Sequence, residues 1–466
     1  MNFWNEKNLK EALQTANTYN FPENWSSNGL VIWQDNYLPK NMVLARNEGE
    51  TRGLSVEKNL KLLEDCSAIL TTNSAPYFKY NKPIVELKGK NGDAIINMSR
   101  YIRKFFTGKV VGVTGSSGKS TTTQMLVDIF STKCKVNSNI KSKANTSWGI
   151  AWNMTRFGID DDYWVVETSL GGGMSRNAAL VKPDYAILTN VAPVHLTGGM
   201  QLKDIAEEKS KIFSKTNEDG AAIIYEGMEF FDTAKNAAEY RGLKIITFGE
   251  SEAADIRIML DGISVKFNIY GKEYSLCNNE PVGRHILLDM AAALAVVNEE
   301  KFDIALALDV LKNFKTLEGR GEEFLSVIPE NKTIHVTDEA YNANPLSMAA
   351  AITAFGEKYN EKNTVLVLGD MAECGEETER YHREMSKSID KVSPAKVLLC
   401  GKDIKYLYDE IKDIYDTKYY TDINSLQKDF FENLSDEDYV FLKSSHSGEL
   451  YKLVAKLKSY EIKPQD

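Results

Sequence analysis

Residues 110–122, which read VVGVTGSSGKSTT, restrict the possible folds of this chain more than any other segment. An apolar, β-branched run leads into a glycine-rich turn, and a helical pattern over residues 119–129 follows it. In a strand, loop and helix of this kind, backbone N–H groups surround an anion and the helix N-terminus adds positive potential. The segment therefore predicts a nucleotide phosphate site built on an α/β sheet.

Each residue type in this loop has a chemical use. Lys119 can reach the β- and γ-phosphates of a nucleotide, and the hydroxyl of Ser120 can hold Mg²⁺. The spacing is TGxxGKST rather than the general GxxxxGK[ST], because Val113 stands where the first glycine is usual, and this variant is the narrower of the two. The residues predicted to contact the nucleotide are Thr114, Gly115, Ser116, Ser117, Gly118, Lys119, Ser120 and Thr121.

The rhythm of strands and helices restarts twice along the 466 residues, a length that one core does not usually cover. We predict a small α/β substrate-binding domain over residues 1–106 and a central, largely parallel-sheet ATPase domain over 107–316. Residues 317–466 repeat the alternation and predict a Rossmann-like domain without its usual glycine fingerprint. The predicted fold class is therefore α/β with three domains.

Charge and composition exclude several classes of function. A net charge of -10 and a pI near 5.3 argue against nucleic-acid or anionic-membrane partners. No run approaches the ~18 apolar residues of a membrane span, so we expect a cytoplasmic protein. The five cysteines lack CxxC spacing and indicate neither a disulfide framework nor a zinc site.

Polar residues follow two predicted strands at the edge where a parallel sheet binds ligands. Glu167 ends the run at 163–166, and His195 follows the run at 184–188, so both could bind Mg²⁺. A cap or turn role for Glu167 and a structural role for His195 remain alternatives. Lys209, in a helical segment, is by default a solvated partner of Glu208 or another nearby acid.

These motifs together resemble the Mur ligase family, from about Lys82 to the C-terminus. The family's TGxxGK[ST]T loop stands at 114–121, its asparagine-containing segment at 144–149, its TN[IV]xxxH motif at 189–195 and its lysine-bearing helix at 205–213. Strings at 338–348 and 368–377 are most similar to members that add D-alanyl-D-alanine to a UDP-muramoyl-tripeptide.

The resemblance implies an ATP-dependent ligase that joins a carboxylate to the amine of an amino acid or dipeptide through an acyl-phosphate, acting as a monomer with ATP and Mg²⁺. Ser120, Glu167, His195 and a carbamylated Lys209 would hold Mg²⁺. The same resemblance places further residues at the nucleotide: Arg320 at the phosphates, Asp338 and Asp289 in the site, and Tyr341 and Asn342 near the adenine.

Three departures from the family pattern keep other functions open. Ile286 and Asp289 stand where asparagines are usual, and His446 replaces the arginine of a KGSR-like segment. The first ~100 residues lack a clear copy of the family's uridine-nucleotide pattern. The alternatives are a Mur-like ligase for another carboxylate outside the peptidoglycan pathway, a P-loop NTPase that works as a conformational switch, and a silent scaffold, which the intact loop argues against.

Overall fold

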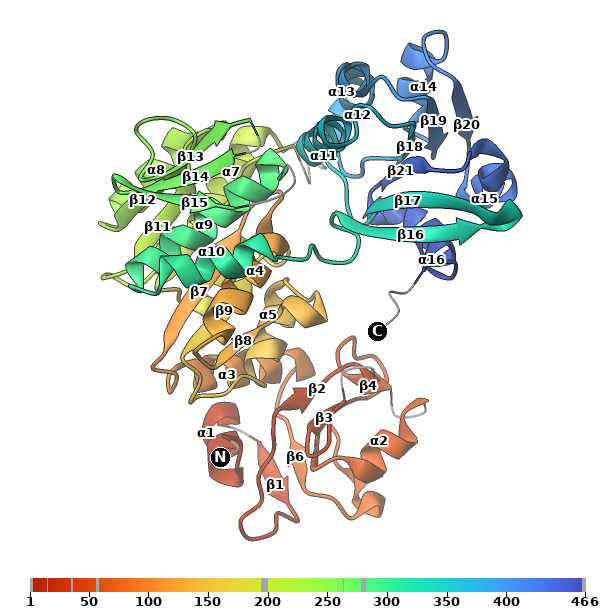
Figure 1. The fold of residues 1–466 in the computed structure, drawn as a ribbon. Coiled ribbons are helices and arrows are strands. Elements are labelled where there is room, and N and C mark those ends of the chain that lie inside the picture. Colours follow the sequence, from red (N-terminus) through yellow and green to blue (C-terminus); the bar gives the residue numbers. More distant parts are fainter. Residues whose placement is uncertain are drawn as a thin grey trace.

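The computed structural model describes residues 3–14, 16–34, 37–55, 58–193, 200–262, 264–277 and 282–462. Its strands form three separate sheets, which Figure 1 shows as a red and orange N-terminal lobe, a yellow and green central lobe and a blue C-terminal lobe. The prediction of an α/β fold with three domains is confirmed.

The N-terminal sheet has the order β1-β6-β5-β3-β2, with β4 paired to β3, and only the β1–β6 pair is antiparallel. Its helices are α1 (Glu6–Leu13) and α2 (Leu60–Asp65), and α3 (Asn91–Arg103) leads into the central sheet. The strands are β1 (Asn17–Tyr19), β2 (Leu30–Val31), β3 (Met42–Arg46), β4 (Leu54–Ser55), β5 (Ala68–Thr71) and β6 (Ile84–Glu86).

The central sheet has the order β15-β14-β13-β12-β11-β10-β7-β9-β8 and is parallel from β8 to β13. Two antiparallel pairs, β13–β14 and β14–β15, extend it at one edge. The strands are β7 (Lys109–Thr114), β8 (Val136–Ser138), β9 (Tyr163–Glu167), β10 (Tyr185–Leu188), β11 (Ala221–Tyr225), β12 (Lys244–Gly249), β13 (Ile256–Asp261), β14 (Ser264–Ile269) and β15 (Lys272–Leu276).

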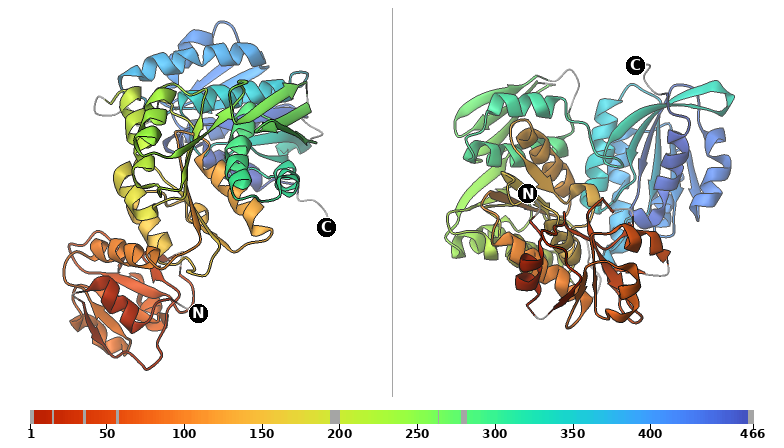
Figure 2. Two further views of the ribbon diagram at one scale, coloured as in Figure 1. Left: turned by 90° about the vertical axis from the view of Figure 1, so that its left-hand side faces the viewer. Right: turned by 90° about the horizontal axis from the view of Figure 1, so that it is seen from below.

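Helices cover both faces of this sheet, as the turned views of Figure 2 show. One face packs against α4 (Lys119–Ser131), α9 (Arg284–Glu299) and α10 (Ile304–Lys312) through residues such as Val111 and Met290. The other face packs against α3 and against α5 (Ser147–Met154), α6 (Met174–Val181), α7 (Leu202–Ser210) and α8 (Phe231–Tyr240).

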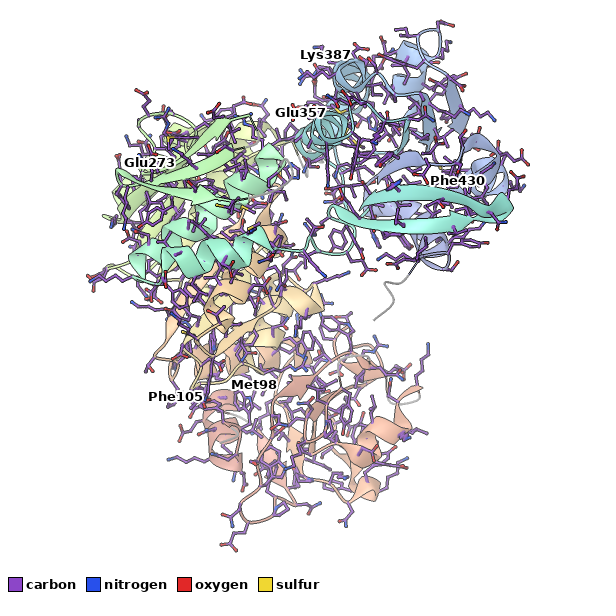
Figure 3. The ribbon with its side chains drawn as sticks, viewed as in Figure 1. Met98, Phe105, Glu273, Glu357, Lys387 and Phe430 are labelled. Atoms are coloured by element: carbon purple, nitrogen blue, oxygen red, sulfur yellow. The ribbon has the colours of Figure 1, made fainter. Side chains whose placement is uncertain are left out.

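The N-terminal and central sheets share one core rather than meeting at a polar interface. Trp4, Met98 and Trp152 all lie in the same buried cluster, and Met98 is labelled in Figure 3. The indole N–H of Trp4 donates to the carbonyl of Thr155 at 2.6 Å, and that of Trp152 donates to the carbonyl of Leu30 at 2.6 Å. These contacts fix the two lobes relative to each other.

The C-terminal sheet has the order β16-β17-β21-β18-β19-β20, with only the β16–β17 pair antiparallel. Its strands are β16 (Glu322–Ile328), β17 (Lys332–Glu339), β18 (Thr364–Gly369), β19 (Lys396–Cys400), β20 (Thr417–Tyr420) and β21 (Asp438–Lys443). The helices are α11 (Pro345–Lys358), α12 (Thr378–Glu384), α13 (Ser386–Val392), α14 (Lys405–Ile411), α15 (Ile423–Asp429) and α16 (Leu450–Lys458). In the described residues, no helix is long and apolar enough to cross a membrane.

Candidate active site at the phosphate loop

The phosphate loop connects β7, which ends at Thr114, to α4, which begins at Lys119. Gly118 caps α4 with a φ of 77°, a left-handed conformation that favours glycine. A Cβ on Gly115 would lie 1.9 Å from the hydroxyl of Thr189, so this position has no room for a side chain. The loop is therefore glycine-rich because its backbone lies against β10 and bends sharply into the helix.

Asn190, at the end of β10, braces the loop from the neighbouring strand. Its side-chain oxygen accepts hydrogen bonds from the backbone N–H groups of Ser116 and Ser117 at 3.1 and 2.9 Å. Its amide nitrogen donates to the Ser117 hydroxyl at 2.7 Å. Asn190 belongs to the TN[IV]xxxH motif at 189–195, and its contacts identify it as a residue that shapes the loop.

Two lysines converge on one carbonyl of the loop. Lys119 and Lys209 both donate to the oxygen of Gly115, at 3.0 and 2.8 Å. Lys209 lies on α7 and is 2% exposed, and no acid among the described residues pairs with it. Its burial and the nearby charge of Lys119 lower the pKa of Lys209 well below its ordinary value. The solvated pair with Glu208 is therefore wrong, because Glu208 accepts from Lys211 instead.

Glu167, at the end of β9, lies directly beside the start of α4. One carboxylate oxygen accepts from the Ser120 hydroxyl at 2.6 Å, and the other accepts from the side-chain amide of Asn145 at 2.6 Å. Asn139 binds both the backbone N–H and the carbonyl of Glu167, at 2.8 and 2.9 Å. Asn139 and Asn145 were not among the predicted site residues, although an asparagine following a short strand at this edge was a usable signal.

Asp289, on α9, packs against the loop at Gly118 and against the first turn of α4 at Thr122. Its carboxylate accepts from the Thr122 hydroxyl at 3.1 Å and lies so close to Gly118 that a Cβ there would approach it to 2.1 Å. Burial raises the pKa of Asp289 well above its ordinary value, while Thr122, Arg320 and Lys119 act in the opposite direction. Asp289 therefore contacts the loop that holds the phosphates.

Arg320 belongs to the segment that leads into the C-terminal sheet, and it stacks over the ring of Tyr341 at 4.3 Å. Its charge is close enough to Lys119 to lower the pKa of that lysine, together with the larger effect of burial. Lys143, from the central lobe, lies 5.2 Å from the centre of the same Tyr341 ring. The central and C-terminal lobes therefore meet around Tyr341.

The other predicted residues of the C-terminal lobe, Asp338 and Asn342, lie at the end of strand β17 and just after it. Asp338 is 2% exposed, accepts from the N–H of Ala340 at 2.9 Å, and has its pKa raised to about 6 by burial. Asn342 is exposed and its carbonyl accepts from Lys443 at 3.2 Å. His446 stacks on Tyr451 at 4.7 Å and lies 6.4 Å from Tyr341.

The predicted metal ligand His195 lies outside the described residues, as does the rest of 194–199. Within the described ranges, no group of three or more histidine, cysteine, aspartate and glutamate side chains could hold a metal ion. Of the four predicted ligands, the structure places Ser120 and Glu167 in contact, with Lys209 bonded to the loop that precedes Ser120.

Residues 113–297 match the Mur ligase middle domain, and residues 325–446 match the Mur ligase glutamate ligase domain. UDP-N-acetylmuramoyl-tripeptide--D-alanyl-D-alanine ligase of Rickettsia prowazekii is 24% identical over 80% of this chain and 83% of its own length. The enzyme of the same name from Bacillus subtilis is 28% identical over 77% of each chain.

Solved structures show the same fold over nearly the whole length. MurF from Acinetobacter baumannii superposes with a TM-score of 0.79 at 19% identity, covering 98% of this chain and 99% of that one. MurF ligase from Thermotoga maritima in complex with ADP gives 0.75 at 21% identity, over 93% and 97%. The two domain matches, the related sequences and the shared three-sheet fold confirm the resemblance read from the motifs. The chain belongs to the Mur ligase family of ATP-dependent ligases that form amide bonds.

Proposed function

We propose that this chain adds D-alanyl-D-alanine to the free carboxylate of a UDP-muramoyl-tripeptide, using ATP and an acyl-phosphate intermediate. The observation that carries the proposal is the meeting of Lys119, the Ser120–Glu167 pair and Arg320 at one edge of the central sheet. The curated relatives that span most of this chain carry that activity in their names.

In the first step, the N–H groups at the start of α4 and the ammonium of Lys119 hold the phosphates of ATP. Lys119 leaves the Gly115 carbonyl to do so, and Asn190 keeps the loop in shape. Arg320 adds a second positive charge as the acceptor carboxylate attacks the γ-phosphorus. An acyl-phosphate and ADP form, and the amine then attacks the acyl carbon and releases phosphate.

The donor set fits Mg²⁺, because a hydroxyl and a carboxylate oxygen lie together at Ser120 and Glu167. The buried Lys209 favours an uncharged amine, the form that reacts with CO₂ to give a carbamate oxygen ligand. Ser120, Glu167, His195 and the carbamylated Lys209 would hold the metal. Bound there, Mg²⁺ would neutralise charge on the phosphate and acyl oxygens. Asn139 and Asn145 orient Glu167 for this role.

A cavity of about 290 Å³ in the N-terminal lobe is the proposed entry for the acceptor. It is lined by Trp33, Arg46 and Arg52 among others, which supply an aromatic surface and two cations for an anionic ligand. The sequence of this lobe lacks a clear copy of the family's uridine-nucleotide pattern, so the support for this acceptor comes from the cavity and the relatives. His446 stands where the family has an arginine, and this replacement favours the alternative that the incoming amine is a different one.

Phosphate release from ATP and Mg²⁺ tests the proposal, with UDP-N-acetylmuramoyl-tripeptide present and with or without D-alanyl-D-alanine. Release that requires both substrates, and a product of the pentapeptide mass, is the expected result. ATP turnover independent of any amine would instead indicate a conformational NTPase. If the folded protein binds ATP but does not use this pair, the ligase acts on another carboxylate or amine.

A further inference from the structure

Two arginines from different lobes meet over one tryptophan. Trp148 begins the first turn of α5, and the guanidinium carbon of Arg52 lies 5.6 Å from the centre of its ring. The guanidinium carbon of Arg176, on α6, lies 5.0 Å from the same ring. Arg52 comes from the N-terminal lobe, between β3 and β4, whereas Arg176 comes from the central lobe.

Neither guanidinium group is neutralised by the residues around it. Both arginines are exposed, and across the described ranges no carboxylate pairs with either of them. Other exposed arginines do have acid partners, as with Arg284 and Glu250 at 2.6 Å or Arg380 and Glu377 at 2.9 Å, so the lack of a partner is not a general property of arginines on this surface. In a chain with a net charge of -10, two unpaired guanidinium groups at one place leave a local site for an anion.

The backbone around the tryptophan is held firmly. A Cβ on Gly92, at the start of α3, would lie 2.9 Å from the Trp148 ring, so the absent side chain leaves space for the ring. Asn91 donates from its side chain to the carbonyl of Arg52. Ser147, the residue before Trp148, donates to the side-chain oxygen of Asn177, the residue after Arg176, at 2.5 Å. The two arginines are therefore presented from fixed segments.

This pair has contacts that lead toward both the acceptor cavity and the segment that holds Glu167. Arg52 lines the 290 Å³ cavity of the N-terminal lobe, where Arg46 is a second cation without a described partner. On the other side, Trp148 follows three residues after Asn145, whose amide donates to Glu167. Arg52 therefore links the cavity to the Trp148 ring, which stands three residues from a side chain that contacts Glu167.

We propose that Arg52 and Arg176 together bind a non-reacting carboxylate of the acceptor's peptide, and so set the position of the carboxylate that is phosphorylated. This inference rests on the proposed function. A guanidinium fork matches a carboxylate in two parallel hydrogen bonds, and both guanidinium groups lie within 5.6 Å of the centre of the Trp148 ring. An exposed cation–π contact alone is weak, and the two lobes already share the Trp4 and Trp152 core, so a purely structural clasp is not needed.

The test is steady-state kinetics of Arg52→Gln, Arg176→Gln and the double variant with UDP-N-acetylmuramoyl-tripeptide. Losing one charge-assisted contact is expected to raise KM for the acceptor roughly ten- to a hundred-fold, with KM for ATP and for D-alanyl-D-alanine unchanged. The matched control is Arg100→Gln, which removes an exposed arginine from α3 and should leave KM for the acceptor as it is. A KM within twofold of the unmodified protein in both single variants would overturn the proposal.

Two altered acceptors identify the anion. In the first, the non-reacting peptide carboxylates are converted to carboxamides. The unmodified protein should then show a KM for this acceptor that is raised as in the arginine variants, and substituting the arginines should raise it no further. With muramoyl-tripeptide lacking the UDP group, the effect of Arg176→Gln should persist. If it vanishes there, the arginines bind the diphosphate and the carboxylate assignment is wrong.

Direct binding separates this inference from the proposed function. Isothermal titration of the acceptor in the presence of ADP gives a Kd without turnover. If the unmodified protein binds the acceptor but forms no product with D-alanyl-D-alanine, the proposed amine fails, while weaker binding by the arginine variants still supports the carboxylate site. Equal Kd values for all variants would overturn the site even if the ligase reaction is confirmed.

Discussion

The contact between Gly118 and Asp289 gives the sharpest prediction for the phosphate loop. In Gly118→Ala, the residue keeps a φ of 77°, which costs alanine about 1–2 kcal/mol. The new Cβ would also lie 2.1 Å from Asp289 Oδ1 and 3.0 Å from its Cγ, and crowding of this kind typically costs about 1–3 kcal/mol. Together the two effects should lower the free energy of unfolding by about 2–5 kcal/mol.

Calorimetric melting measures this loss. For a unit the size of the central lobe, about 2–4 °C per kcal/mol predicts that Gly118→Ala melts roughly 4–20 °C lower. Gly242→Ala is the matched control, because its φ is 67° and a Cβ there would meet nothing within 4 Å. It should show the backbone cost alone, a fall of roughly 2–8 °C. ADP should also bind more weakly to Gly118→Ala, since the loop backbone must move.

A double-mutant cycle separates the crowding from the backbone cost. Asp289→Ala removes the atoms that the new Cβ would strike, so the double variant should recover about 1–2 kcal/mol relative to the sum of the single changes. Additive effects would refute the reasoning, because they would mean that Asp289 moves aside freely. Equal melting of Gly118→Ala and Gly242→Ala would refute it as well.

Three further changes test the site. Lys119→Ala should abolish ATP-dependent ligation while the melting temperature stays within a few degrees. Near-normal turnover would contradict the phosphate-loop assignment. Lys209→Ala should lose most activity and regain part of it with an added short-chain carboxylate, whereas full activity without rescue would count against a carbamate. Burial raises the pKa of Asp338 to about 6, so the folded state holds this proton more tightly than the unfolded chain. The free energy of unfolding that this shift contributes is present below about pH 4 and is lost as the pH rises through 6, by about 2 kcal/mol. Between pH 4 and 8, unfolding curves of Asp338→Asn should therefore show a smaller fall in the free energy of unfolding than those of the unmodified protein, by that amount. Equal falls would contradict the shift.

The departures from the family pattern have different structural meanings. Asp289 contacts the phosphate loop, so an aspartate in place of the family's usual asparagine affects how the loop is held. His446 lies away from the loop, stacked on Tyr451 near Tyr341, where the central and C-terminal lobes meet. The first departure therefore bears on the loop before α4, and the second on the place where the central and C-terminal lobes meet.

The sequence by itself determined the local elements. The predicted runs at 163–166 and 184–188 correspond to β9 and β10, and the predicted helix at 119–129 is α4, longer by two residues. These predictions succeed because strand and helix periodicity act over a few neighbouring residues. The glycines of the loop were recognisable for the same reason, since their conformation is a local requirement.

Tertiary structure alone decided which distant residues meet. The insertion of β21 between β17 and β18, and the antiparallel edge formed by β13, β14 and β15, depend on how helices cover the sheets. The contact of Ser120 with Glu167 spans 47 residues and that of Lys209 with Gly115 spans 94. A helical pattern marks Lys209 as a surface residue, and only packing of α7 against the loop buries it. In the same way, no periodicity could bring Arg52 and Arg176 to Trp148, because their positions follow from the core that the N-terminal and central lobes share.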